Sequence, residues 1–291
     1  MPDRTGCHGL DYELRRKAKM PNSMNGGVKT HYEVSGEGPA MVLLHANPFD
    51  HNLFLYQIHH FSAFFTVIAT DMRGYGRSDV VTTPFTLSDL AEDVYAVCRQ
   101  EGVTEAIVLG ISTGSGVALL MGLDRPDFCR AVVLVGGGSG KGTVTPEELA
   151  LPTARMQEYL DKGLDGNHLH HLEDLVRPDF AQSELGGYLL RVVVERGRDL
   201  GWKAEGIVEV LRARRGTDMT SRLGEMRVPT LVINGEFDNG RPGGTRTAEL
   251  IPDAVHKILP GAGHACCIED PGLFDAFVME FLDDNGLLPK G

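Results

Sequence analysis

Short runs of apolar, β-branched residues recur along the chain and constrain its fold more than any other feature. Each run is four to six residues long, and polar or glycine-containing segments separate it from the next. Runs of this length and composition are typical of strands that are buried on both faces of a parallel sheet. The sequence therefore predicts strands at 41–45, 65–70, 106–109, 131–135, 230–233 and 255–259.

Amphipathic segments lie between several of these strands. The segment 87–101 places apolar side chains on one helical face, and Thr86 or Ser88 can cap its first turn. Near the end of the chain, Asp270 and Pro271 are typical of the N-cap and the first position of a helix. Alternating strands and helices imply right-handed crossovers, and hence a doubly wound, mostly parallel α/β sheet covered on both faces.

The stretch 139–227 lacks strands of this kind and is predicted to be a helical insertion. Val192 to Val194 is a brief β-like run inside it. An insertion between two core strands can cover a site at the carboxyl ends of the strands. We therefore predict a core of residues 1–138 and 228–291 and a lid of residues 139–227. Helices are expected in the lid at 145–161, 168–176, 183–197 and 203–215.

Charge and cysteine content exclude several classes of protein. The 291-residue chain has a formal net charge of −12, which disfavours nucleic acid and anionic membranes as partners. Its five cysteines form no CxxC pair, and the first 20 residues lack the apolar core of a secretory signal. No apolar run approaches the roughly 20 residues of a membrane-spanning helix. We expect a soluble, cytoplasmic protein, and the sequence leaves open whether it forms a homo-oligomer.

The strand at 106–109 leads into the sharpest chemical signal, the motif Gly110-Ile111-Ser112-Thr113-Gly114. A serine on a tight turn between a strand and a helix has its hydroxyl held above the sheet. Glycines two residues before and after avoid collisions with the strand and the helix. The helix that follows favours negative charge at its start. Ser112 is therefore predicted to be a nucleophile, and the backbone N–H of Thr113 an oxyanion donor.

A serine hydroxyl needs a base that takes its proton, and two downstream loops complete such an arrangement. Asp238 follows the strand at 230–233, and His264 follows the strand at 255–259. Both loops leave the sheet at the carboxyl ends of strands, where open α/β sheets place their ligand sites. His264 is expected to act as general base and then as general acid, while Asp238 holds its tautomer. Glu236 is the alternative acid.

In order and spacing, these segments resemble the α/β-hydrolase superfamily, in its small lidded branch of enol-lactonases, esterases, haloperoxidase-like enzymes and ring-cleavage-product hydrolases. The resemblance covers Lys29 to Leu282 and implies an eight-stranded sheet and a reaction without a cofactor. The matching pieces are Leu44-His45-Ala46-Asn47-Pro48, the run from Asp71 to Ser78, the serine turn, Gly235 to Asp238, and Gly261 to His264.

By the same resemblance, the loop after the strand at 41–45 supplies the second oxyanion N–H, which falls on Asn47. The family usually has glycine after the histidine of this loop, whereas Ala46 follows His45 here. Alanine is strained wherever φ must be positive. We therefore expect an oxyanion hole formed by Asn47 and Thr113, with a loop geometry that depends on Ala46.

Other conspicuous residues have simpler interpretations. Asp71 is expected to fix a turn, and His45 to be a buried, hydrogen-bonded histidine. No metal site is predicted, because carboxylate or cysteine spacing is lacking around the clustered histidines His59, His60, His168, His170 and His171.

The glycine-rich run from Val135 to Thr143 resembles a phosphate-binding loop. However, Val135 occupies the position of its first glycine, and Gly142 replaces the hydroxyl residue that binds magnesium. We interpret the run as a flexible entry to the lid, where Lys141 could face an anionic substrate, and keep nucleotide binding as a minor alternative.

The sequence thus predicts a serine hydrolase that cleaves a small carboxylic ester or lactone through an acyl-enzyme. A carbon–carbon bond hydrolase of a ring-cleavage product is the nearest alternative, because it would use the same three residues. A ligand-binding sensor with a slow or idle triad is the alternative from another class of protein. Phe49, Met156 and Trp202 are expected to contact the substrate.

Overall fold

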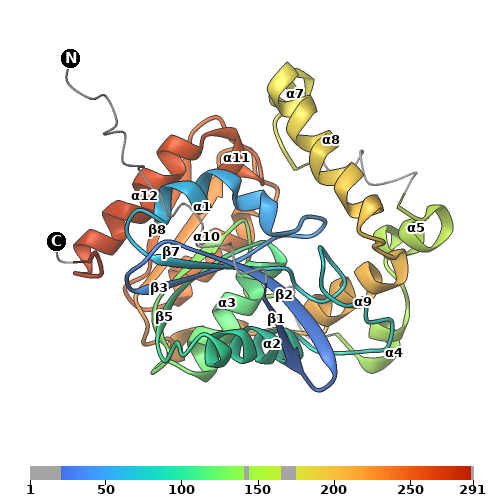
Figure 1. The fold of residues 1–291 in the computed structure, drawn as a ribbon, viewed down its shortest axis with the longest axis horizontal. Helices are drawn as coiled ribbons and strands as arrows, with labels where there is room; N and C mark the ends of the chain where they lie inside the picture. The colour runs from blue at the N-terminus through green and yellow to red at the C-terminus, as the bar shows by residue number, and fades with distance from the viewer. Residues whose placement is uncertain (1–20, 141–143, 165–174, 290–291) are drawn as a thin grey trace, which may run out of the picture.

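The computed structural model describes residues 21–140, 144–164 and 175–289. Its centre is an eight-stranded sheet in the order β1-β2-β4-β3-β5-β6-β7-β8 (Figure 1). The strands from β4 to β8 in this order are parallel to their neighbours, whereas β2 is antiparallel to both β1 and β4. The predicted eight-stranded, mostly parallel sheet is confirmed.

The six parallel strands lie at the predicted apolar runs. The central ones are buried along almost their whole length, because helices cover both faces of the sheet. The strands are β3 Ala40–Leu44, β4 Thr66–Thr70, β5 Ala106–Ile111, β6 Cys129–Val135, β7 Thr230–Gly235 and β8 Val255–Leu259.

A hairpin of two more polar strands extends the sheet at one edge. Strands β1 Asn22–Asn25 and β2 Val28–Ser35 are joined by Gly26 and Gly27, whose φ values are 55° and 86°. Two consecutive positive φ values are those of a tight hairpin turn, and glycine adopts them without strain. Only the middle of β2 is buried, so this strand lacks the continuous apolar run of the parallel strands.

Helices pack on both faces of the sheet (Figure 1). The helices α1 and α12 lie on one face, and α2 and α3 on the other. The predicted caps are confirmed, since Thr86 accepts from the Asp89 N–H in a capping box and Asp270 accepts from the Leu273 N–H. The helices are η1 His51–Phe54, α1 Leu55–Phe61, α2 Leu87–Gln100, α3 Thr113–Asp124, α10 Arg241–Leu250, α11 Cys266–Glu269 and α12 Pro271–Asp284.

The segment between β6 and β7, called the insertion below, is helical where it is described. Its helices gather beside the core in Figure 1, in yellow-green to orange. They are α4 Pro146–Ala150, α5 Ala154–Lys162, α7 Pro178–Gln182, α8 Glu184–Asp199, α9 Ala204–Arg215 and the 3₁₀ helix η2 Thr220–Glu225.

The structure corrects two details of the predicted insertion. The helix expected at 145–161 is divided into α4 and α5, because Pro152 disfavours helical backbone at Leu151, whose ψ is 135°. The β-like run at 192–194 belongs to α8. Most of the helix expected at 168–176 falls outside the described residues. None of the described helices has both the length and the apolar character needed to cross a lipid bilayer.

Candidate active site

Ser112 occupies a sharp turn between β5 and α3. Its φ is 54° and its ψ is −106°, a backbone conformation that is rare for a residue with a side chain. The Ser112 N–H donates to the carbonyl of Val135 at 2.8 Å, and its own carbonyl accepts from the N–H of Gly116 at 3.2 Å. The neighbouring strand β6 and the first turn of α3 therefore maintain the strained backbone.

Close backbone contacts explain the glycines on either side of Ser112. A Cβ atom at Gly110 would lie 2.1 Å from the carbonyl oxygen of Gly114. One at Gly114 would lie 2.1 Å from the carbonyl oxygen of Leu44. Both distances are far inside van der Waals contact, so the spacing of the motif follows from the tight packing of β3, β5 and α3.

Asp238 and His264 meet in the loops after β7 and β8, with 2.7 Å between Asp238 Oδ1 and His264 Nδ1. Asn234 Nδ2 donates to Asp238 Oδ2 at 2.9 Å, and the Gly240 N–H donates to Oδ1 at 2.6 Å. Burial alone would raise the pKa of Asp238, but these interactions outweigh it and keep the pKa below its usual value. Since an ionised carboxylate only accepts hydrogen bonds, the hydrogen lies on Nδ1 of His264.

Ser112 and His264 line the same cavity, whose volume is about 660 Å³. The glycine-rich run after β6 forms part of its wall. A Cβ atom at Gly136 would lie 2.9 Å from Cε1 of His264, so this position has no room for a side chain. Residues 141–143, including Lys141, lie outside the described residues. The glycines in the wall are Gly136, Gly137, Gly138 and Gly140.

Two other residues expected at the site, Thr113 and Met156, also line this cavity. Phe49 and Trp202 are not among its described lining residues. Phe49 is buried in the apolar core on the α1 face of the sheet. Trp202 packs edge-on against Tyr75, and its indole N–H donates to the carbonyl of Gly76 at 3.1 Å. Both aromatic rings therefore contribute to packing, where large side chains remove the most apolar area from water.

Asn47 lies in the loop after β3 and is joined to Pro48 by a cis peptide bond. Its side chain is buried, and its Oδ1 accepts a hydrogen bond from the hydroxyl of Tyr75. Among the described non-glycine residues, only Ser112 and Asp253 have positive φ, so Ala46 is not in that conformation. The loop therefore contains alanine without the strain that positive φ would impose.

Two carboxylates hold the loop that carries His264. Glu269, whose side chain is buried, accepts from the Gly263 N–H at 2.7 Å with one oxygen and from the Arg177 N–H at 2.8 Å with the other. Glu236, the alternative acid considered from sequence, is exposed and accepts from the Gly261 N–H at 2.8 Å. It binds the loop backbone, whereas the imidazole of His264 binds Asp238.

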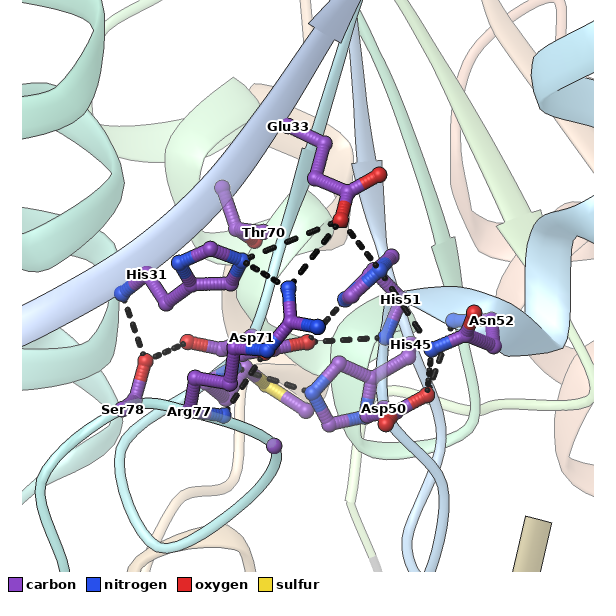
Figure 2. Close-up of polar contacts among 12 residues, drawn as sticks. His31, Glu33, His45, Asp50, His51, Asn52, Thr70, Asp71, Arg77 and Ser78 are labelled. Atoms are coloured by element: carbon purple, nitrogen blue, oxygen red, sulfur yellow. Dashed lines mark hydrogen bonds and ion pairs between the residues drawn. The ribbon is translucent and has the colours of Figure 1, made fainter. Parts of the chain in front are cut away.

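A second group of charged side chains forms a buried ionic network near the ends of β3 and β4 (Figure 2). His51 stands between two carboxylates, with Nδ1 2.6 Å from Asp71 Oδ1 and Nε2 3.2 Å from Glu33 Oε1. Burial alone would lower the pKa of His51, but the two carboxylates outweigh it and raise the pKa to about 10. His51 is therefore a buried imidazolium at neutral pH.

Asp71 and His45 have the structural roles expected from sequence. Asp71 accepts from the backbone N–H groups of His51 and Arg77, each at 2.9 Å, and so fixes the turn after β4. His45 is buried, and its Nε2 accepts from the Met72 N–H at 2.9 Å. Burial lowers the pKa of His45, so it is a neutral ring that joins two loops.

The ring nitrogens of His31 and His51 and the carboxylate of Glu33 lie close enough together to suggest a metal site. However, Arg77 Nη1 lies 3.3 Å from His31 Nε2 and 3.4 Å from Glu33 Oε1. A divalent cation here would face both this guanidinium and the His51 imidazolium. We therefore interpret the cluster as an ionic network that is balanced by its own residues.

Sequence reasoning missed three arginines that line the cavity, namely Arg155 in α5 and Arg214 and Arg215 in the last turn of α9. The cavity's described lining residues include no Asp or Glu. Basic residues at the end of a helix ordinarily interact with its carbonyl groups, so nothing in the local sequence indicated a second role for Arg214 and Arg215. Only the three-dimensional packing of the insertion brings these side chains to the cavity of Ser112.

Comparison with known families agrees with this fold. The alpha/beta hydrolase fold family matches residues 39–271, which is most of the chain. The chain therefore belongs to the α/β-hydrolase family, and the hydrolase class expected from sequence is confirmed.

Individual relatives and solved structures are similar to most of this chain. A 2-hydroxy-6-oxononadienedioate/2-hydroxy-6-oxononatrienedioate hydrolase from Cupriavidus pinatubonensis is 30% identical over 76% of this chain and 77% of its own length. The polyketide synthase ThaQ from Burkholderia thailandensis is 29% identical over 89% of this chain, which corresponds to only 12% of ThaQ. The enol-lactonase from Burkholderia xenovorans LB400 shares the fold, with a TM-score of 0.82 and 24% identity over 90% of this chain and all of the enol-lactonase chain.

Proposed function

We propose that this chain is a serine hydrolase that cleaves a small carboxylic ester or lactone through an acyl-enzyme. One observation carries the proposal. A strained serine lines a cavity that is also lined by an imidazole, and that imidazole is hydrogen-bonded to a buried carboxylate. Serine, histidine and acid in these positions serve nucleophilic acyl transfer.

In the proposed reaction, Nε2 of His264 takes the proton of Ser112 Oγ as that oxygen attacks the acyl carbonyl. Asp238 keeps Nδ1 protonated and stabilises the imidazolium that forms. The bond from the acyl carbon to the leaving oxygen then breaks, and His264 returns its proton to that oxygen. Water, deprotonated by His264, attacks the acyl-enzyme, releases the carboxylic acid and restores the serine hydroxyl.

We assign stabilisation of the tetrahedral oxyanion to the backbone N–H groups of Thr113 and Asn47. Thr113 is the first residue of α3, where N–H groups have no partner within the helix. The hydroxyl of Tyr75 binds the Asn47 side chain and thereby supports the second donor. Both donor residues are buried, and hydrogen-bond donors stabilise developing charge more strongly where water is excluded.

We further propose that the insertion acts as a lid over this site. Met156 and Arg155 of α5 and Leu211 of α9 contribute to the cavity, so substrate would be enclosed between the core and the insertion. A volume of about 660 Å³ lies in the range of small-molecule sites, which supports a small substrate.

A carbon–carbon bond hydrolase of a ring-cleavage product is the second candidate. The Cupriavidus relative, which is named for such a substrate, favours it. The same three residues would serve this reaction, so the residues of the triad do not discriminate between the two. Comparing turnover of aryl esters, small lactones and a ring-cleavage product by the same preparation would do so.

Two measurements test the proposed function. A fluorophosphonate probe should label Ser112 covalently, as identified by peptide mass spectrometry. Hydrolysis of p-nitrophenyl acetate should fall about 10³-fold or more in Ser112→Ala. Ser88→Ala, which changes an exposed serine in α2, should retain the wild-type rate. Equal hydrolysis by wild type and Ser112→Ala, without labelling of Ser112, would refute the proposal.

A further inference from the structure

The cavity of Ser112 is bordered by positive charge although the protein is acidic. Arg155, Arg214 and Arg215 line it, and none of its described lining residues is an Asp or Glu. The whole chain has a formal net charge of −12, so this local excess of cations does not follow from composition. A partly desolvated cationic cavity favours an anionic ligand.

Two of the arginines are held by backbone carbonyl groups. Arg214 donates to the carbonyls of Gly138 and Thr217. Arg215 donates to those of Glu148 and Leu151, each at 2.9 Å. Burial lowers the pKa of Arg214, although the charge of Asp218 opposes this effect. The carbonyl groups hold the guanidinium groups of Arg214 and Arg215 in place, so both contribute positive charge to the cavity.

Arg155 differs from them, because its Nε and Nη2 atoms are buried without a hydrogen-bond partner among the described residues. These two N–H groups lie on one edge of the guanidinium and point in parallel. This edge matches the two oxygens of a carboxylate. The chain itself contains an example, since Arg73 uses Nε and Nη2 to bind the two oxygens of Asp93, each at 2.7 Å.

The residues around Arg155 indicate that the Nε and Nη2 edge of its guanidinium faces the interior of the protein. Tyr159, one turn later in α5, is buried, and burial raises its pKa. Arg155 and Asn47 both interact with Tyr159 and oppose that increase. Asn47 belongs to the proposed oxyanion loop, so Arg155 lies on the side of α5 that is turned toward the reaction site.

We infer that the substrate is an anion, an ester or lactone that carries a free carboxylate, and that Arg155 binds this carboxylate through Nε and Nη2. The inference rests on the proposed function of Ser112 and adds the chemical class of its substrate. Arg214 and Arg215 support binding through their charge. Arg155 is thus a specificity-determining residue, and the acyl-transfer machinery remains Ser112, His264 and Asp238.

Two esters that differ only at the end of the acyl chain test the inference. p-Nitrophenyl butyrate ends in a methyl group, and mono-p-nitrophenyl succinate ends in a carboxylate at the same position. Wild type should show the higher kcat/KM with the succinate ester. Arg155→Met should lower that value by at least about 10-fold and leave the value for butyrate unchanged. Arg155→Lys, which keeps the charge but not the paired donors, should give an intermediate value.

The controls separate this inference from the proposed function. Lys162→Met removes an exposed positive charge from the same helix and should not change the preference. Two results would overturn the inference: an equal loss of kcat/KM on both esters in Arg155→Met, or a higher kcat/KM of wild type with the butyrate ester. Labelling of Ser112 would then still support the proposed hydrolase. If Ser112 is not labelled, the proposed function fails. Calorimetric binding of succinate to wild type, lost in Arg155→Met, would then still support the carboxylate subsite, and equal binding to both would overturn it.

Discussion

The imidazole of His264 lies 2.7 Å from the carboxylate of Asp238, and this contact orients the proposed base. In Asp238→Asn, the amide would present a hydrogen to Nδ1 and select the wrong tautomer. We expect kcat for p-nitrophenyl acetate to fall by about 10³-fold or more in steady-state assays. Asn234→Ala, which removes another partner of Asp238 but keeps the carboxylate, should cost far less. A loss below tenfold in Asp238→Asn would argue against the assigned role.

The close approach of Gly114 to the backbone of Leu44 leads to a prediction about stability. A methyl group at position 114 would lie 2.1 Å from a backbone oxygen that cannot move without shifting β3. We expect Gly114→Ala to lower the free energy of unfolding in urea by about 3 kcal/mol or more, and to impair hydrolysis. Gly224→Ala is the matched control, because a Cβ there meets no atom within 4 Å. Equal stability of the two variants would disprove the steric explanation.

Glu269 should position His264 through the backbone. Both of its oxygens accept N–H groups, from Gly263 and Arg177, and glutamine can replace only one of the two acceptors. We expect Glu269→Gln to lower kcat by about 10-fold or more with a smaller change in KM. Glu236→Gln should be nearly neutral, because Glu236 accepts a single N–H and is exposed. Similar kinetics in both variants would contradict a positioning role for Glu269.

The network around His51 predicts how stability depends on pH. Its pKa is raised from an ordinary 6.5 to about 10, so the folded protein holds this proton more tightly than the unfolded chain. The resulting stability is fully present below pH 6.5 and is lost as the pH rises through about 10. At pH 7, His51→Gln should melt on the order of 10 °C below wild type, because Asp71 and Glu33 lose their shared cation.

This difference in melting temperature should narrow between pH 7 and pH 10.5, as measured by thermal denaturation monitored by circular dichroism. The comparison of wild type with His51→Gln cancels alkaline effects from other residues. A difference that stays constant over this range would show that His51 is not protonated in the folded state.

The parallel core could be predicted from sequence because its signals are local. A strand that is buried on both faces must be apolar throughout, so runs such as 131–135 were visible without knowledge of their neighbours. The hairpin of β1 and β2 lacked such a run because much of β2 is only partly buried. Pro152 did carry a local signal, and the helix break at Leu151 could have been predicted from it.

Part of the candidate site could be predicted because its signals lie within short stretches of sequence. Ser112 needs glycines at fixed positions, and Asp238 and His264 follow strands whose ends meet at one edge of the sheet. Phe49 and Trp202 show the limit of this reasoning, because an aromatic residue near a loop can pack into the core as readily as it can contact a ligand. Arg155, Arg214 and Arg215 reach the cavity only because α5 and α9 pack against the core. This packing depends on residues that are far apart in the sequence, so it could not be predicted from local patterns.

The strands β6 and β7 are hydrogen-bonded neighbours, with Val135 paired to Ile233, although the whole insertion lies between them in the chain. The insertion therefore leaves and re-enters the core at adjacent points. Ser112, Asp238 and His264 all come from core loops outside it. A change in the length or sequence of the insertion can therefore leave the pairing of β6 with β7, and the loops that carry Ser112, Asp238 and His264, in place.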